Sequence, residues 1–347
     1  MSPCTILRAG PKPNPGVERP YRNSAPTAPT DLWLAGNEGQ PAAALELKLG
    51  SDGLRRYPDT AEVAARAAER FGVAADQVLV TAGADDALLR IALAFLAPGR
   101  SAVVPSPTFE MIPRYAAVAG GELIEVPWEP GAPYPLDAAL DATREDSSLV
   151  YVVSPNNPTG AVATAEDVLR ACDAAPDALV VVDQAYGEFA DEDLTEAALS
   201  RPNAVVLRTM SKAYGAAGLR VGFALGRPEL LGVLEAAGNP YPCATPSLDA
   251  ALRLLGMDVS ESIEAVRAER AALVERLRTL GLDAASSQGN FVYARTPAAD
   301  ALRVRVAEEG IAIRSFGRAV RITCPANPKD FERLLAALEA ACLEVLS

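Results

Sequence analysis

Residues 204–225 read AVVLRTMSKAYGAAGLRVGFAL, and this stretch joins an apolar run to a segment rich in small residues. The apolar residues at its start predict a buried strand. Thr209 and Ser211 come just before Lys212, and Arg220 follows eight positions after the lysine. Hydroxyls and a guanidinium bind phosphate, and a lysine amine beside them is placed to bond with the carbonyl carbon of a phosphorylated aldehyde. The stretch therefore predicts a phosphate site with Lys212 as its nucleophile.

The composition of the chain limits what this site can do. The chain has 347 residues, half of them apolar, and a net charge of −13, so a nucleic-acid or anionic-membrane partner is not expected. No apolar run approaches the roughly 20 residues that span a bilayer, and the N-terminus lacks an apolar leader. The five cysteines are odd in number and far apart. We expect a cytoplasmic protein with reduced thiols.

The sequence contains no histidine. This absence excludes Ser-His-Asp and Cys-His catalysis and every histidine-ligated metal site, so no metal is predicted. Acid–base chemistry near neutral pH must then come from a lysine, a carboxylate, a tyrosine or a cofactor. The alternative is that Lys212 is a surface lysine between a strand and a loop. The rest of the chain decides between this interpretation and a functional site.

Alternating strand and helix patterns predict an α/β fold with a mostly parallel sheet that helices cover on both faces. The predicted strands of this sheet are 78–81, 101–104, 149–153, 179–183, 204–207 and 220–225. Residues 1–36 are rich in proline and glycine and are interpreted as an N-terminal arm. Residues 37–238 form the predicted large domain. The proline-rich stretch 239–246 is the predicted hinge, and 239–347 form a small α+β domain that the N-terminal arm joins.

Polar residues follow two of these strands, at the strand ends where ligands bind open α/β sheets. Gly83, Ala84 and Asp85 join the strand 78–81 to a helix, whose N-terminal backbone N–H groups can meet an anion. After the strand 149–153 comes Ser-Pro-Asn-Asn157-Pro-Thr-Gly, in which the X-Pro steps hold an asparagine amide near the strand ends. Each segment alone is also explained by a helix start or a rigid loop.

Two further strands carry charged residues. Asp183 ends a strand with three valines, where a carboxylate is costly unless it meets a cation such as a protonated pyridine nitrogen. Tyr186, three residues later, can reach a phenolate oxygen. Arg321 lies on a short apolar strand and is suited to bind a carboxylate or phosphate bidentately, a role that Arg314 or Arg318 can share. The alternatives are that Asp183 caps a helix and that Arg321 is a surface residue.

Taken together and in order, these segments resemble the fold type I pyridoxal-phosphate aminotransferases, and within them the histidinol-phosphate aminotransferase-like branch. The resemblance covers nearly the whole chain from Leu34. The matching segments are Arg56-Tyr57-Pro58, Gly83-Ala84-Asp85, Pro107-Thr108-Phe109, Asn156-Asn157-Pro158-Thr159-Gly160, Asp183-Gln184-Ala185-Tyr186, Ser211-Lys212 and Arg321-Ile322-Thr323. The resemblance implies a mostly parallel seven-stranded sheet in the large domain, a small α+β C-terminal domain, and pyridoxal 5′-phosphate as cofactor.

The resemblance also implies the catalytic roles. Lys212 takes the position of the lysine that bonds to the cofactor and moves the substrate proton. Asp183 takes that of the aspartate that keeps the pyridine nitrogen protonated. Tyr186 and Asn157 resemble the donors to the ring oxygen, and Phe109 resembles the aromatic residue stacked on the ring.

The remaining roles concern the cofactor phosphate and the substrate. The residues that resemble the phosphate cup are Gly83, Ala84, Asp85, Thr209, Ser211 and Arg220. Tyr57 resembles a tyrosine that reaches the phosphate of a partner subunit, which implies a homodimer with shared active sites. Arg321, with Asn157 and Arg314, is the implied substrate site.

We therefore predict an enzyme, an aminotransferase that moves an amino group between an amino acid or an amino-alcohol phosphate such as histidinol phosphate and a 2-oxo acid. Two alternatives keep the cofactor. One is a decarboxylase like that of threonine phosphate, or an enzyme acting at Cβ or Cγ or with O2; the more remote one is a regulatory domain. The chain departs from the family at Asn37-Glu38-Gly39-Gln40-Pro41, at Gln184 and at 241–245. The first and third departures lie where the substrate side chain would be read, so the substrate stays open.

Overall fold

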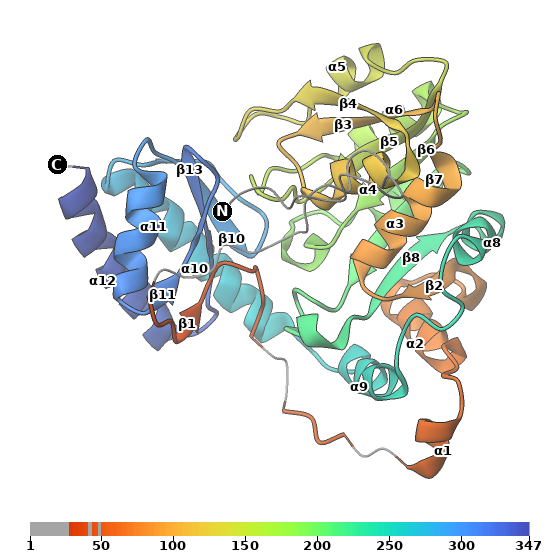
Figure 1. Cartoon of the computed structure of the whole chain (residues 1–347), viewed down its shortest axis with the longest axis horizontal. Helices are drawn as coiled ribbons and strands as arrows, with labels where there is room; N and C mark the ends of the chain where they lie inside the picture. Colours follow the sequence, from red (N-terminus) through yellow and green to blue (C-terminus); the bar gives the residue numbers. More distant parts are fainter. Residues whose placement is uncertain (1–27, 41–43, 48–49, 347) are drawn as a thin grey trace, which may run out of the picture.

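A computed structural model describes residues 28–40, 44–47 and 50–346, and its centre is a seven-stranded sheet (Figure 1). Across the sheet the strands are β2 (Val78–Thr81), β8 (Gly222–Gly226), β7 (Ala204–Thr209), β6 (Leu179–Asp183), β5 (Ser147–Val153), β3 (Ser101–Ser106) and β4 (Glu122–Pro127). All pairs are parallel except those that β8 makes with β2 and β7. The predicted mostly parallel seven-stranded sheet is confirmed.

Helices cover both faces of this sheet because its central strands are apolar on both sides. Val150 and Val152 of β5 face one core, which includes residues of α2 (Ala61–Phe71), α6 (Ala165–Ala174) and α7 (Thr195–Leu199). Leu149, Tyr151 and Val153 face the other core, with α3 (Ala84–Phe95), α4 (Met111–Ala119) and α8 (Pro228–Ala236). Both layers hold the carboxyl ends of the parallel strands in fixed positions.

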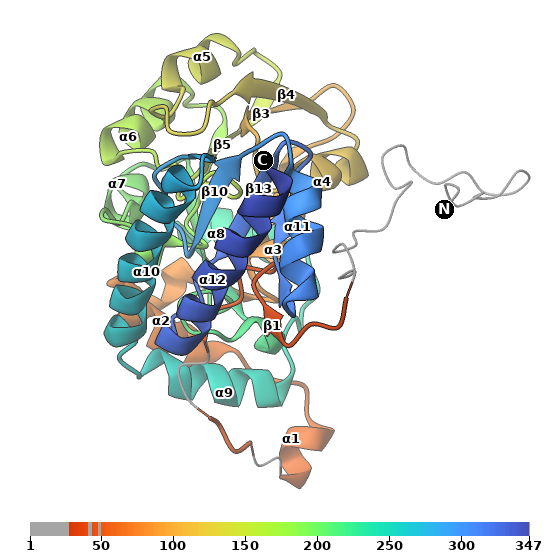
Figure 2. The ribbon, with the colours of Figure 1, turned by 90° about the vertical axis from the view of Figure 1, so that its left-hand side faces the viewer.

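A second, antiparallel sheet lies in the C-terminal part of the chain. Its order is β12 (Arg314–Ser315), β13 (Ala319–Thr323), β10 (Phe291–Arg295) and β9 (Asp283–Ala284). Figure 2 shows three long helices in front of it: α10 (Ser260–Thr279), α11 (Ala299–Glu308) and α12 (Pro328–Val345). β1 (Leu32–Trp33) pairs in parallel with β11 (Ile311–Ala312), so a segment of the predicted N-terminal arm joins this unit.

Two local predictions differ from the structure. β4 was not predicted, because it is an edge strand with two glutamates, a proline and largely accessible side chains. β8 begins at Gly222 rather than at position 220, since Arg220 has a left-handed backbone with φ 53°. In the predicted arm, whose residues 1–27 lie outside the described residues, Leu32 and Trp33 form the two-residue strand β1.

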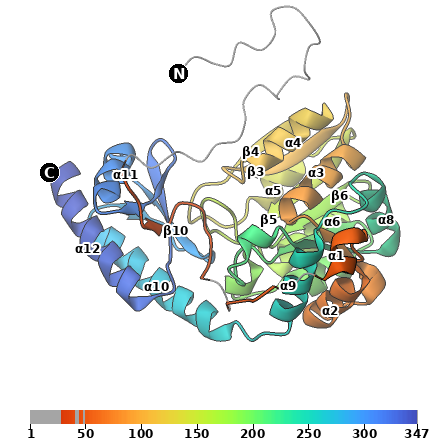
Figure 3. The same ribbon diagram turned by 60° about the horizontal axis from the view of Figure 1, so that its bottom comes forward.

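The boundary between the domains, placed at residue 239 from the sequence, stays a prediction. After the proline-rich stretch, α9 (Thr245–Leu255) packs against α2 and α1 (Ser51–Arg55), as Figure 3 shows, and α10 begins the helical layer of the second sheet. Of the helices in the described ranges, none is long and apolar enough to cross a membrane.

Candidate active site

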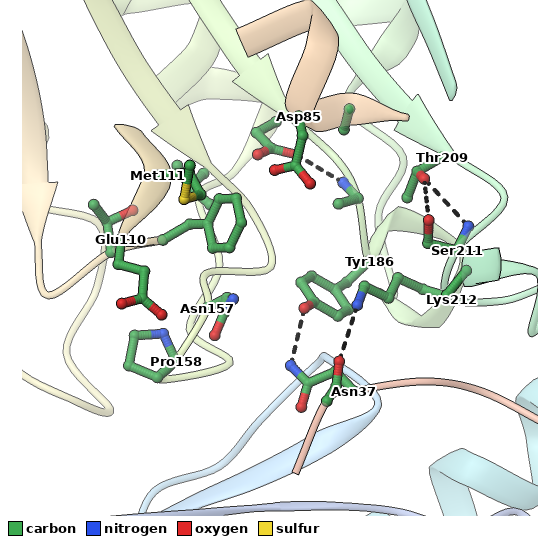
Figure 4. A pocket seen from close by; sticks show the side chains of 18 of the residues that line it. Asn37, Asp85, Glu110, Met111, Asn157, Pro158, Tyr186, Thr209, Ser211 and Lys212 are labelled. Carbon is green, nitrogen blue, oxygen red and sulfur yellow. Dashed lines mark hydrogen bonds between the residues drawn. The ribbon is translucent and has the colours of Figure 1, made fainter. Parts of the chain in front are cut away.

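A cavity of about 690 Å³ lies where the strands β5, β6 and β7 end, and the second sheet closes its other side (Figure 4). Twelve of the residues predicted from the sequence line it: Ala84, Asp85, Phe109, Asn157, Asp183, Tyr186, Thr209, Ser211, Lys212, Arg220, Arg314 and Arg321. These residues come from segments more than 200 positions apart. The fold therefore brings nearly all of the predicted site into one place.

The anion-binding end of the cavity lies between the end of β7 and the start of α3. Thr209 Oγ1 and Ser211 Oγ are 2.9 Å apart, and Arg220 Nη1 lies 3.4 Å from Ser211 Oγ. Arg220 Nη2 also lies 3.4 Å from a carboxylate oxygen of Asp85. Desolvation by burial raises the pKa of the Asp85 carboxyl, while the charge of Arg220 opposes that shift. Two hydroxyls, a guanidinium and a helix N-terminus are groups that can bind a phosphate dianion.

Glycines keep this end open for a ligand. Gly83 precedes α3 with φ 80°, and a Cβ there would lie 2.7 Å from Arg220 Nη2. A Cβ on Gly222 would lie 2.6 Å from the carbonyl carbon of Gly83. Side chains at either position would fill the cradle and displace the guanidinium.

The cradle gives a first prediction. Gly83→Ala should weaken cofactor binding roughly 10- to 100-fold, because it combines a strained left-handed backbone with a collision at Arg220. Equilibrium binding of pyridoxal phosphate to the cofactor-free protein measures the change. Gly232→Ala is the matched control, since an added Cβ at that position meets nothing. Equal affinities for the Gly83 variant and the unchanged chain would contradict the assignment of the cradle.

Asp183 lies at the end of β6 and is 4% exposed. Its Oδ1 accepts a hydrogen bond from the backbone N–H of Ala185 at 3.0 Å. Desolvation by burial raises the pKa of this carboxyl to about 6, against the smaller lowering effect of the Ala185 bond and of the charge on Lys212. A carboxylate in this position is stabilised by a cation that enters the cavity.

Lys212 and Tyr186 lie side by side in the wall of the cavity (Figure 4). Lys212 Nζ donates to the backbone oxygen of Gly36 at 3.3 Å and lies 5.5 Å from the centre of the Tyr186 ring. Tyr186 is 4% exposed and its hydroxyl accepts from Asn37 Nδ2 at 2.9 Å. The amine therefore lies beside a phenol that can donate a hydrogen bond to the same ligand.

Two arginines occupy the side of the cavity that the second sheet provides. Arg321 on β13 is 3% exposed; it donates to Asn157 Oδ1 and, at 2.8 Å, to the backbone oxygen of Ala35. Arg314 on β12 forms an ion pair with Glu110, and both guanidinium groups lie within 5.5 Å of the Phe316 ring. This arrangement can hold a carboxylate or phosphate.

Tyr57 is not among the residues that line the cavity. Its side chain is 77% exposed and stacks on Tyr241, with ring centroids 4.2 Å apart. Within one chain the structure does not bring Tyr57 to the phosphate end, so its assigned role across a subunit interface stays a prediction.

Several lining residues were not predicted as site residues. Asn37 had a signal, because it lies in the segment where the chain departs from the family pattern. Glu110 and Phe316 gave none, since their pairing with Arg314 depends on how β12 approaches the start of α4. Contacts between distant segments of this kind leave no periodic pattern in the sequence.

The described residues fit pyridoxal 5′-phosphate. The donors at Thr209, Ser211 and Arg220 and the glycine cradle suit its phosphate, and the buried Asp183 carboxylate suits a protonated pyridine nitrogen. Lys212 would offer an amine to its aldehyde, and Tyr186 a donor to its ring oxygen. Across residues 28–40, 44–47 and 50–346 there is no group of three or more acidic or cysteine side chains that could hold a metal ion.

Comparison with known proteins agrees with this geometry. Residues 27–338 match the family model of class I and II aminotransferases. The chain is 34% identical over 324 residues to histidinol-phosphate aminotransferase 1 of Dechloromonas aromatica, covering 89% of each protein. It is 35% identical over 310 residues to the aromatic amino acid aminotransferase of Corynebacterium efficiens, covering 86% of this chain and 89% of that one.

A solved structure has the same architecture. The histidinol-phosphate aminotransferase of Sinorhizobium meliloti, determined in complex with pyridoxal 5′-phosphate, superposes with a TM-score of 0.83 and 25% identity, covering 98% of this chain and 100% of that chain. The relatives named here are aminotransferases, which favours transamination over the decarboxylase, Cβ/Cγ and regulatory alternatives. The chain belongs to the class I and II aminotransferase family, as a pyridoxal-phosphate-dependent enzyme of fold type I.

Proposed function

We propose that this aminotransferase acts on primary amines that carry an anionic group, in the manner of an amino acid or an amino-alcohol phosphate, and that a 2-oxo acid receives the amino group. The observation that carries the proposal is that Lys212, Asp183 and Arg321 line one cavity. When bound, pyridoxal phosphate supplies an electron sink that makes a proton at the substrate Cα removable near neutral pH.

Each residue of the site would then have a separate role, set by its position in the cavity. Thr209, Ser211 and Arg220 hold the cofactor phosphate, and Asp183 keeps the pyridine nitrogen protonated. Lys212 holds the cofactor and, once its amine is free, moves the proton at Cα as a general base and acid.

Arg321 orients the substrate by its anionic group, with Asn157 fixing the guanidinium. Phe109 packs on the cofactor ring. The second sheet shields the proton transfer from water, since Arg321 and Phe316 close that side of the cavity.

The substrate side chain would lie near Arg314, Glu110 and Phe316. The two curated relatives act, by their names, on histidinol phosphate and on aromatic amino acids. A cavity with a second arginine beside an aromatic ring suits either a phosphate ester or an aromatic side chain. We propose these two classes of amino donor, with histidinol phosphate first.

The test incubates the purified enzyme with histidinol phosphate, phenylalanine, tyrosine or aspartate in the presence of 2-oxoglutarate, and measures glutamate. Glutamate formation with histidinol phosphate or an aromatic amino acid is the expected result. Release of CO2, ammonia or peroxide without glutamate would instead support one of the alternative reactions.

We also propose a cytoplasmic homodimer in which Tyr57 of each subunit contributes to the active site of the other. The support is the exposure of Tyr57 and Tyr241, since a stacked aromatic pair at the surface is typical of an interface. Sedimentation equilibrium should give twice the chain mass. A monomer at micromolar concentration that retains full activity would contradict the shared site.

Arg321 gives a second prediction. Arg321→Gln should lower kcat/KM for a carboxylate or phosphate substrate roughly 10²- to 10³-fold, because a buried charge-assisted pair is lost. Steady-state kinetics with the best donor measure the effect. Arg318→Gln is the matched control, since Arg318 is close in sequence but exposed and not among the lining residues. A large loss in the Arg318 variant with none in the Arg321 variant would reverse the assignment.

A further inference from the structure

Asn37 is a buried residue that joins the second sheet to the centre of the active site. Its side chain is 1% exposed, and its amide nitrogen lies 2.9 Å from the hydroxyl of Tyr186 (Figure 4). Its backbone has φ 55°, in the left-handed region where asparagine is one of the few side chains found regularly. The chain therefore adopts an uncommon conformation at the point where this amide meets the phenol.

The second sheet holds Asn37 through three further hydrogen bonds. The backbone N–H of Asn37 donates to Thr323 Oγ1 at 3.2 Å, and the Thr323 hydroxyl shares its single proton between Asn37 Oδ1 at 3.1 Å and the backbone oxygen of Leu34 at 2.8 Å. Asn290 Nδ2 donates to the backbone oxygen of Asn37 at 3.2 Å. Thr323 and Asn290 are both fully buried. These contacts hold Asn37 against the second sheet, and its amide nitrogen faces Tyr186.

This geometry sets the direction of the phenol proton. An amide NH2 only donates, so the Tyr186 oxygen must accept from Asn37, and its single proton stays available for another acceptor. The Tyr186 and Phe291 rings pack in a T-shaped arrangement, with centroids 5.1 Å apart, so the phenol is held at one place. The remaining directions from the hydroxyl include the cavity that Tyr186 and Lys212 line.

We infer that Asn37 is a positioning residue that orients the Tyr186 proton toward the ring oxygen of the cofactor. The inference rests on the proposed role of Tyr186 as a donor to that oxygen. A donor there stabilises the negative charge that remains when the bound chromophore loses its proton. Asn37 would thus set the pH at which the cofactor band titrates, by acting through Tyr186.

Asn37→Asp is the sharpest test, because it is nearly isosteric and tolerates the same backbone region. An ionised carboxylate only accepts, so Tyr186 would turn its proton toward residue 37 and away from the cavity. The midpoint pH of the cofactor absorbance titration should rise by about one to two pH units, the scale of one hydrogen bond to a charged group.

The same substitution in a Tyr186→Phe background is the control. Tyr186→Phe alone should also raise the midpoint, and adding Asn37→Asp should then change it no further. A second rise in the double variant would mean that the new charge acts directly on the cofactor, which would overturn the inference. Asn37→Gly, which keeps the left-handed backbone and removes the amide, should raise the midpoint less than Asn37→Asp does, and again only when Tyr186 is present.

The outcomes separate this inference from the function on which it rests. A protein that takes up no cofactor would refute the proposed function. Tyr186→Phe without effect on the midpoint would refute the role of Tyr186. A shift in Tyr186→Phe with none in the folded Asn37→Asp or Asn37→Gly variants would overturn the inference alone, because the phenol would then orient without Asn37.

Discussion

Replacing Lys212 by alanine is expected to lower the turnover number roughly 10⁴-fold or more, while the protein stays folded. The substitution would remove both the amine proposed to bond to the cofactor and the group proposed to move the Cα proton. Losing a residue that serves in several catalytic steps lowers turnover far more than losing a single contact does. Because Lys212 is only partly buried and its amine donates to the backbone oxygen of Gly36, little stability should be lost. Steady-state glutamate formation and a thermal unfolding curve measure the two effects.

The chain offers a clear control for this experiment. It has only four lysines, Lys12, Lys48, Lys212 and Lys329. Lys329 is exposed near the start of α12, away from the cavity, so Lys329→Ala should keep full activity. Substantial turnover in the Lys212 variant, at more than a few per cent of the unchanged enzyme, would contradict the assignment of the nucleophile.

Asp183→Asn should lower kcat/KM roughly 10²- to 10³-fold and, at the same time, stabilise the cofactor-free protein at higher pH. The loss of activity follows because an amide cannot stabilise a protonated pyridine nitrogen as a buried carboxylate does. The gain in stability follows from the pKa of Asp183, which burial raises to about 6 from an ordinary 3.8. A carboxyl with a raised pKa favours the folded state below its ordinary pKa, and this contribution is lost as pH rises through about 6.

The variant should gain about 3 kcal/mol in free energy of unfolding at high pH, because burial raises the pKa of Asp183 from 3.8 to about 6. Thermal unfolding of both cofactor-free proteins, below pH 4 and well above pH 6, measures it. The melting temperatures should converge at low pH and separate above pH 6, with the variant more stable. Asp177→Asn, at an exposed position before β6, should show no such separation. A variant less stable than the unchanged chain at high pH would contradict the desolvation argument.

Much of this account follows from the sequence, for physical reasons. The valine-rich runs of β5 and β6 predict buried parallel strands, because only a sheet covered on both faces keeps such runs from water. Gly83 follows β2, Asp183 ends β6 and Thr209 ends β7, and these three strands run in the same direction, so their carboxyl ends lie at one edge of the sheet. Lys212, Thr209, Ser211 and Arg220 lie in one segment of the sequence, so they were predicted together.

What the sequence did not predict depends on contacts between distant segments. The Glu110–Arg314 ion pair joins the start of α4 to a two-residue strand, and the Asn37–Tyr186 bond joins the N-terminal segment to the loop after β6. β4 pairs with a neighbouring strand on one side only, and its side chains are largely accessible. It can therefore carry polar residues and lacks the apolar run of a buried strand. Local patterns carry little information about any of these, since the packing of the two sheets decides them.

The most direct test of the central claim is reduction of the purified enzyme with borohydride, followed by peptide mapping. The account predicts a yellow protein whose visible band disappears on reduction, with the mass of the reduced cofactor on the peptide that contains Lys212 and on no peptide that contains Lys12, Lys48 or Lys329. A protein that stays colourless after pyridoxal phosphate is added, or a label on another lysine, would contradict it.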